Sequence, residues 1–343
     1  MSASRVMRRW MGLLVVFGLM GGATGCDKIK KFAEKAAKDA KEKKKRAKED
    51  DADASLGGKL NNYVYCINHT STSVGRASDR YYTWVDRDTG PTGKERNVYG
   101  THDIHNVDTC KGKLEQAKKG KPELKDLEKA ADEWLEALDE VEPINKDVVA
   151  YYKGKDYKDD GFKKGKELHE KYAKALDKFF EVDKVFRNAF RAKREELDKS
   201  EMARMERQGL DVALAHMKFL KQANELVEIA FHEMDTIDEG KLKAELADTQ
   251  DKYDEMLKQA AKNKRQVASS WSSFASAAEN YVNAAKALHR RRRDNKPLTP
   301  QELQRYRIRP GGVEGTPDHV HEMFNRMIQA SNNLRWPAGP RGK

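Results

Sequence analysis

Apolar residues recur along most of this chain at alternating steps of three and four, the spacing that places one narrow seam along a helix. The first seam follows Gly57-Gly58, which we expect to open a helix, and it stops at the turn residues Asp88–Gly93. Its members are Leu60, Tyr63, Ile67, Thr70, Val74, Ala77, Tyr81 and Trp84. The pattern predicts one helix whose seam has small or polar members in its middle.

Two more seams follow residues 94–121, a stretch whose structure the pattern leaves open. One covers residues 124–141, where Pro143 interrupts it, and a new or kinked helix is expected beyond the proline. The next helix starts at about Phe162 and weakens over residues 198–209, so a kink or a break is left open there.

The clearest seam lies in residues 246–288, where a heptad pattern passes through one polar position at Lys264. A last helix is expected after Thr316-Pro317, which read as the N-cap and the first helical residue. Helices joined by short turns pack antiparallel. The predicted fold is therefore all-α, an elongated antiparallel helical bundle with coiled-coil-like long helices over residues 57–336.

The N-terminus is typical of an export signal. Three arginines precede the apolar run Met11–Met20, which is too short to span a bilayer, and small residues then lead to Cys26. This ending resembles the lipobox of bacterial lipoproteins, in which such a cysteine is acylated and becomes the new N-terminus. We therefore predict that residues 1–25 are removed and that Cys26 carries lipid, palmitate included. An ordinary signal peptide with an incidental cysteine is the alternative.

Lipidation predicts a protein that is held in the bacterial cell envelope, attached to a membrane through its N-terminal lipid and facing the periplasm. Asp27 favours the inner membrane. Residues 27–54 consist almost entirely of Lys, Glu, Asp and Ala, which indicates a charged tether, partly helical or disordered. Its lysines are interpreted either as attracted to anionic lipid or as part of a solvated spacer. The expected organisation has four parts. Residues 1–25 are a removed signal, and residues 26–56 are the lipidated cysteine with its tether. Residues 57–336 are the bundle domain, and residues 337–343 are a loose tail.

With Cys26 acylated, Cys66 and Cys110 remain in an oxidising compartment. They most simply form one disulfide bond, and two free thiols are the alternative. No Cys-x-x-Cys pair indicates a metal motif.

The net charge of +11 is unevenly distributed. Residues 290–309 contain 8 basic and 2 acidic residues, and the predicted signal and tether carry further excess positive charge. The helical core is therefore close to neutral. The predicted compartment, and not the charge, argues against nucleic acid as a partner. The charged fraction of 36% fits the solvated faces of long helices.

The sharpest surface feature is the run of Arg290, Arg291, Arg292 and Arg293. One hypothesis is an anion contact for lipid head groups, a cell-wall polymer or an acidic envelope protein. The other is a helix C-terminus, where cations complement the helix dipole. Both hypotheses stay open.

The nine histidines predict no metal centre. His102 with His105, and His319 with His321, are short pairs without a cysteine or acidic partner at fixed spacing. Glu228 and His232 share a helix face but lack the second pair that a di-iron bundle needs. No phosphate-binding loop, zinc-protease motif or nucleophile elbow occurs. We therefore expect no catalytic residues, no cofactor and no enzyme.

Both ends of the core resemble one bacterial family. The first part comprises Lys59-Leu60-Asn61-Asn62-Tyr63, Asn68, Arg80-Tyr81-Tyr82 and Trp84, and the second comprises Gly315-Thr316, Phe324-Asn325, Ile328 and Asn332-Asn333-Leu334. These segments are similar to the opening and closing helices of the YiiG-like lipoproteins, a family with a domain of unknown function. Phe324 stands where that family is expected to have tyrosine. The resemblance covers about residues 57–336, implies an all-helical, lipid-anchored envelope protein, and supplies no catalytic residues.

Taken together, these features favour a non-enzymatic helical scaffold or interaction module displayed from a lipid tether. The alternative is a ligand-binding module with a pocket where the irregular segments 89–121 and 289–316 meet. A third hypothesis, a metal protein or enzyme, requires His102, His105 and a carboxylate to converge in space.

Overall fold

The computed structural model describes residues 25–230 and 236–337, and within them it contains helices and no strands, as predicted. The predicted signal up to residue 24, His232 and the tail from residue 338 lie outside the described residues. The helices are α1 (Gly25–Cys66), α2 (Thr72–Tyr82), α3 (Val107–Lys119), α4 (Lys125–Gly154), α5 (Tyr157–Asp160), α6 (Lys163–Arg207), α7 (Asp211–Ile229), α8 (Glu239–Lys262), α9 (Trp271–Arg293), α10 (Pro300–Ile308) and α11 (Pro317–Asn332). A π-helical turn, Ile67–Ser71, separates α1 from α2.

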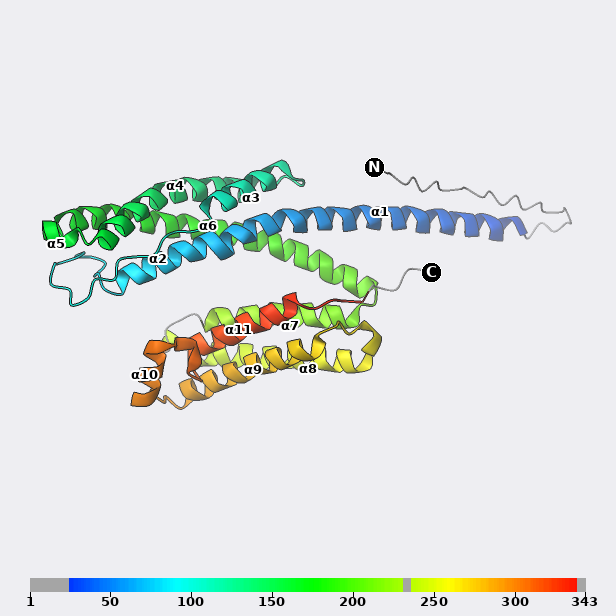
Figure 1. The fold of residues 1–343 in the computed structure, drawn as a ribbon. Coiled ribbons are helices and arrows are strands. Elements are labelled where there is room, and N and C mark those ends of the chain that lie inside the picture. The colour runs from blue at the N-terminus through cyan, green and yellow to red at the C-terminus, as the bar shows by residue number, and fades with distance from the viewer. Residues whose placement is uncertain (1–24, 231–235, 338–343) are drawn as a thin grey trace, which may run out of the picture.

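The helices form two packed groups, each with its own hydrophobic core (Figure 1). The first bundle contains the end of α1 with α2 to α6, and α4 pairs along α6 while α1 pairs with α3. The second bundle contains α7, α8, α9 and α11, in which α7 pairs with α8 and α9 with α11. A tight turn at residues 208–210 joins them, because Gly209 has a φ of +63°. The weak seam of residues 198–209 is therefore helical up to Arg207 and breaks at the glycine.

The Gly57-Gly58 pair does not open the first helix, which is one continuous helix of 42 residues. Each glycine costs a helix interior about 1 kcal/mol relative to alanine. The alanine- and lysine-rich residues before the pair are strong helix formers, and α1 packs against α3 and α6 after it. The predicted tether is therefore helical throughout, and its partly disordered alternative is wrong.

Pro143 likewise lies inside a continuous helix, α4, and starts no new one. A proline removes one helical hydrogen bond. Buried side chains stand on both sides of it, at Val141 and Val148, so packing against α6 holds the helix together across the missing bond.

The seam over residues 246–288 is two helices and not one. α8 ends at Lys262 and α9 begins at Trp271, and the two pack as neighbours. Gln266, between them, accepts a hydrogen bond from Val212 N (3.2 Å) and donates one to Gly209 O (2.8 Å), which ties this turn to the turn before α7. The skipped heptad position at Lys264 marked the turn itself.

The predicted start of the last helix is confirmed. The Thr316 hydroxyl oxygen accepts a hydrogen bond from His319 N (3.3 Å), and Pro317 is the first helical residue. The disulfide between Cys66 and Cys110 is present and joins the end of α1 to the first turn of α3.

A buried carboxylate organises the first bundle. One oxygen of Asp183, on α6, accepts hydrogen bonds from the Ser71 hydroxyl (2.5 Å) and from Trp134 Nε1 (2.8 Å). Its second oxygen accepts from Arg187 Nε (2.6 Å). These contacts join the π-helical turn, α4 and α6 inside a core of aromatic side chains.

A buried lysine fixes the α3–α4 turn against α1. Lys59 Nζ donates to Gly120 O (3.1 Å) and Pro122 O (2.7 Å) and forms an ion pair with the carboxylate of Glu128. A buried ammonium group needs such partners, because transfer from water without them is strongly unfavourable. This pairing explains the first residue of the family motif in physical terms.

We predict that Asp183→Ala lowers the free energy of unfolding by about 3 kcal/mol, since the Trp134 and Ser71 donors would stay buried without an acceptor. Urea unfolding followed by tryptophan fluorescence measures this. The matched control is Asp177→Ala on the same helix, whose exposed ion pair with Arg87 contributes at most about 1 kcal/mol. Equal losses in the two variants would contradict the proposed organising role.

A second prediction concerns pH. Burial against Phe274 and Trp336 lowers the pKa of His216 from 6.5 to about 4. Between these pH values the unfolded chain binds a proton that the folded chain does not, so stability is full above pH 6.5 and falls as the pH drops. We expect wild type to lose about 2 to 3 kcal/mol more than His216→Gln between pH 7.5 and pH 4.5 in chemical unfolding. Parallel curves for wild type and His216→Gln would refute the assignment.

Candidate functional site

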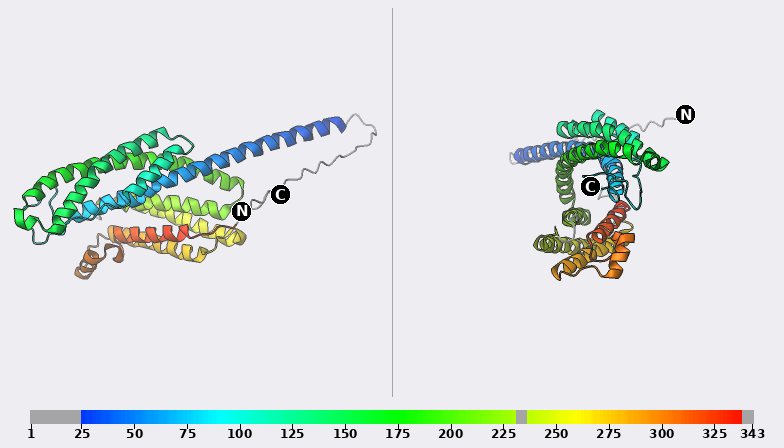
Figure 2. Two further views of the ribbon diagram at one scale, coloured as in Figure 1. Left: turned by 45° about the horizontal axis from the view of Figure 1, so that its top comes forward. Right: turned by 90° about the vertical axis from the view of Figure 1, so that its left-hand side faces the viewer.

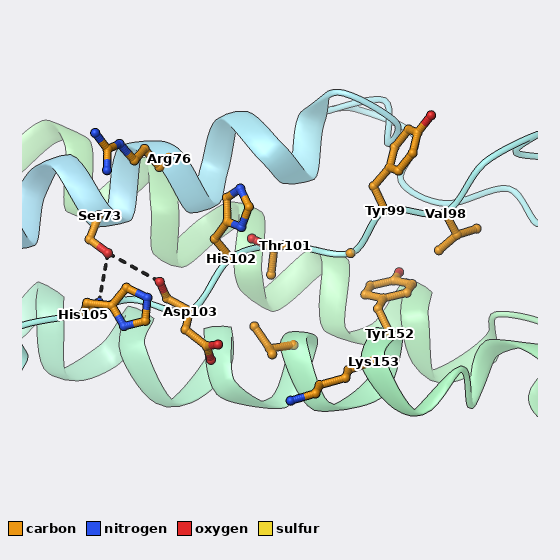
Figure 3. A pocket seen from close by; sticks show the side chains of 12 residues that line it. Ser73, Arg76, Val98, Tyr99, Thr101, His102, Asp103, His105, Tyr152 and Lys153 are labelled. Carbon is orange, nitrogen blue, oxygen red and sulfur yellow. Dashed lines mark hydrogen bonds between the residues drawn. The ribbon is translucent and has the colours of Figure 1, made fainter.

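A pocket of about 600 Å³ opens on the first bundle between α2, the chain segment that follows it, and α4 (Figure 3). Its lining residues are Ser73, Arg76, Val98, Tyr99, Gly100, Thr101, His102, Asp103, His105, Val149, Tyr152 and Lys153. The segment of residues 98–105 forms one wall and has no regular secondary structure.

Hydrogen bonds hold this irregular segment along α2. Trp84 Nε1 donates to Gly100 O (2.8 Å), and the Thr101 hydroxyl donates to Ala77 O (2.6 Å). Gly100 has a φ of +66°, and a Cβ there would lie 3.2 Å from Tyr152 Cβ, so the position favours glycine on both counts. The pocket wall is thus fixed by contacts to the core.

Ser73 closes one end of the segment. Its hydroxyl oxygen accepts from His105 N (2.9 Å) and donates to Asp103 O (3.4 Å), as Figure 3 shows. Both partners are backbone atoms, and neither is a histidine ring nitrogen. The serine therefore positions the chain and is not paired with a general base.

The pocket is predominantly basic. Arg76 on α2 and Lys153 on α4 are exposed on its opposite walls, and His102 and His105 lie on the segment between them (Figure 3). Asp103 is the single acidic side chain of the lining. This balance favours a negatively charged ligand over a cation.

Aromatic rings supply the apolar part of the pocket. Tyr152 is buried, which raises its pKa to about 12 and keeps the phenol neutral at physiological pH. Tyr99 is half-exposed, and the Arg80 guanidinium lies 4.5 Å from its ring centroid. Cations beside aromatic faces suit a ligand that combines an anionic group with a flat or apolar body.

The described residues contain no group of three or more His, Cys, Asp or Glu side chains arranged to hold a metal ion. His102 and His105 are exposed in the pocket without forming such a group, and His319 Nδ1 is hydrogen-bonded to Gly311 O (2.7 Å). Nor does any described helix have an apolar stretch long enough to cross a membrane.

The arginine run occupies the last turn of α9, and its four members differ in their surroundings. Arg291 forms a bidentate ion pair with Glu302, and Arg292 Nε donates to Ile237 O (3.0 Å). Arg293 pairs with the neighbouring Asp294, and Arg290 is exposed. Two of the four guanidinium groups thus tie together parts of the second bundle.

The two irregular segments that the sequence singled out contribute unequally. The pocket draws on residues 98–105 of the first segment and takes no lining residue from 289–316. That second segment belongs to the other bundle and contains the helix α10. Cys26 is the second residue of α1, at the far end of that helix from the first bundle (Figure 1).

Sequence reasoning singled out the segment 89–121 but missed the helical walls of the pocket. Arg76, Tyr152 and Lys153 belong to no motif, and their helical spacing marks them as ordinary members of helix faces. Of the lining residues, only His102 and His105 were singled out individually, and for metal binding. The turn residues before Gly93 were the one available sign that the chain reverses beside α2.

The family-like segments coincide with structural contacts. The Tyr81 hydroxyl lies 3.2 Å from His169 Nδ1, Trp84 holds the pocket segment, and Lys59 fixes the α3–α4 turn. At the other end, Phe324 packs edge-on against Tyr281. These positions build the two cores, and Trp84 also supports the pocket wall.

Comparison with known proteins agrees with this assignment. The chain is 29% identical over 297 residues to the uncharacterized protein YiiG of Escherichia coli (strain K12), covering 83% of this chain and 81% of the relative. No solved structure matches it. The profile of DUF3829, a family described as protein of unknown function, matches residues 54–333. Since that match spans most of the chain, the protein belongs to the DUF3829 family.

Proposed function

We propose that this protein is a lipid-anchored, non-enzymatic helical interaction module of the bacterial cell envelope. In this proposal Cys26 carries the lipid, α1 is the stalk, and the two bundles face the periplasm. The inner membrane is the proposed location because Asp27 follows the acylated residue.

The observation that carries the proposal is the free length of α1. Every side chain from Glu34 to Glu49 is exposed, and the helix extends well beyond both bundles (Figures 1 and 2). Residues 26–56 extend roughly 45 Å at the helical rise. Ion pairs such as Lys45–Glu49 stabilise it along its own surface.

A stalk of this kind fits a lipid at its first residue. The solvated, highly charged residues 34–49 of α1 contribute little to the stability of the bundles. This part of α1 instead separates the two bundles from the membrane to which Cys26 is proposed to be attached. The disulfide between Cys66 and Cys110 further supports an oxidising compartment.

We predict that Cys26→Ala removes the protein from the membrane fraction. Without the thiol no lipid can be attached, and no described helix spans a bilayer. Fractionation of cells, combined with metabolic labelling by palmitate, measures both effects. Wild type should be labelled and sediment with membranes, whereas the variant should be unlabelled and lose at least about 90% of its membrane association.

Asp27→Ser serves as the matched control at the neighbouring position. It should keep the palmitate label and change only the distribution between inner and outer membranes. Label retained by Cys26→Ala, or membrane association unchanged without label, would refute lipid anchoring.

A second candidate function is ligand binding, which the basic, aromatic pocket of about 600 Å³ favours. We propose that it takes an organic anion with an apolar or aromatic body. Arg76 and Lys153 would hold the anionic group from opposite walls, and Tyr152 would contact the body.

The probe for this pocket is 1-anilinonaphthalene-8-sulfonate, which has an aromatic body and one sulfonate. We predict that the Arg76→Gln, Lys153→Gln double variant binds it about ten-fold more weakly, since two charge-assisted contacts are lost. The Lys158→Gln, Lys166→Gln double variant changes two exposed lysines outside the pocket, is the charge-matched control, and should bind as wild type does. Fluorescence titration of the folded proteins decides the outcome, and equal affinities for wild type and the double variant would exclude this pocket.

A further inference from the structure

The helix α10 lies across one end of the second bundle, at the opposite end of the molecule from the first half of α1 (Figures 1 and 2). None of its nine residues is buried. A helix of this length is unstable by itself, so its contacts to the bundle must hold it in place.

Polar contacts attach α10 along one side. Glu302 forms the ion pair with Arg291 of α9 and completes a capping box with Thr299. The Tyr306 hydroxyl donates to Asp318 of α11, and Arg309, directly after α10, pairs with Glu322. At 100° per residue, positions 302, 306 and 309 lie on a single face.

Two exposed apolar side chains flank the outward side of α10. At 100° per residue, Leu303 and Ile308 lie about 140° apart with Gln304 and Arg307 between them, and they are 43% and 80% exposed. Most of the side chain of Ile308 is thus in water, although burial of such a side chain is favourable.

Unpaired positive charge surrounds these apolar residues. Arg290, Arg305 and Arg307 are exposed, and within the described part of the chain no acidic side chain forms an ion pair with any of them. The surface therefore combines apolar insertion with cationic groups, the two elements that bind a helix to an anionic membrane interface.

We propose that α10 docks on the surface of an anionic phospholipid bilayer. Leu303 and Ile308 enter the boundary between head groups and acyl chains, and Arg305 and Arg307 contact lipid phosphates. A polysaccharide would leave the two apolar side chains in water, and an acidic protein surface would have to supply a hydrophobic site beside its charges. A bilayer offers both at once.

The orientation adds a consequence that rests on the proposed function of α1. If Cys26 is held in one membrane, α10 at the far end of the molecule faces a second bilayer surface. The docking of α10 itself does not depend on that anchor, so the two are tested separately.

The test uses the chain from residue 26 with Cys26→Ser, which removes lipidation from the measurement. Binding to phosphatidylcholine vesicles containing 30% phosphatidylglycerol is measured by co-sedimentation, and amide hydrogen exchange reports which segment is covered. We expect slower exchange in residues 300–308 with anionic vesicles and no change with pure phosphatidylcholine. Exchange separates this contact from any binding of the lysines in α1.

Matched variants define the surface. Leu303→Asn with Ile308→Asn should lower the partition coefficient about ten-fold, whereas Val185→Asn, a 50% exposed residue of α6, should not change it. Arg305→Gln with Arg307→Gln should lower it by a similar factor or more, whereas the exposed pair Lys171→Gln and Lys174→Gln should have a much smaller effect. Because α10 has no buried residue, these changes leave both cores intact.

Unchanged exchange in residues 300–308 with anionic vesicles, or equal binding by the Leu303 and Ile308 double variant, would overturn the proposal. Binding to soluble poly-L-glutamate without vesicle binding would overturn it in favour of an acidic protein partner. If wild type with Cys26 proves unlipidated in cells while α10 still binds anionic vesicles, the anchoring proposal fails and the docking proposal stands.

Discussion

The Asp183 carboxylate is the constraint around which the first bundle is arranged. A carboxylate buried among aromatic rings is unfavourable unless its oxygens are fully hydrogen-bonded. It therefore fixes the positions of Ser71 in the π-helical turn and of Trp134 on α4. Because the π-helical turn leads directly into α2, this also sets the face that α2 presents to the returning segment. The pocket wall is hydrogen-bonded to Trp84 and Ala77, so its position depends on the orientation of α2.

The seams of apolar residues were sufficient to predict the all-α class. Each helix buries one face, so its buried residues recur at alternating steps of three and four positions. The predicted helix boundaries were wrong where tertiary contacts override the local helix propensity. Gly57 and Pro143 disfavour helix locally, yet packing of α1 and α4 carries the helix through both. Between Lys262 and Trp271 the opposite error occurred, because the pattern predicted a continuous helix where the chain turns. The heptad pattern resumed in register after the turn, so the polar position at Lys264 was interpreted as one skipped member of a continuous seam and not as the break that Gln266 stabilises.

The candidate site was much less predictable than the fold. Its walls come from α2, the segment 98–105 and α4, and no sequence spacing relates these parts. His102 and His105 were visible as a pair, but the acidic partners that a metal needs are decided by packing. The arginine run shows the same limit. Its four members look equivalent in sequence, whereas Arg291 is tied to Glu302 and Arg290 is solvated.

The disulfide between Cys66 and Cys110 has a mechanical consequence for any force applied to the first part of α1. Tension applied at the start of α1 reaches Cys66 along one helix and passes through a covalent bond to α3. The covalent path through the disulfide bypasses the backbone between the two cysteines. The π-helical turn, α2 and the segment of residues 98–105 all lie in this bypassed loop. The covalent path from α1 to α3 therefore leaves out these parts of the pocket, while α4, which supplies Tyr152 and Lys153, follows α3 along that path.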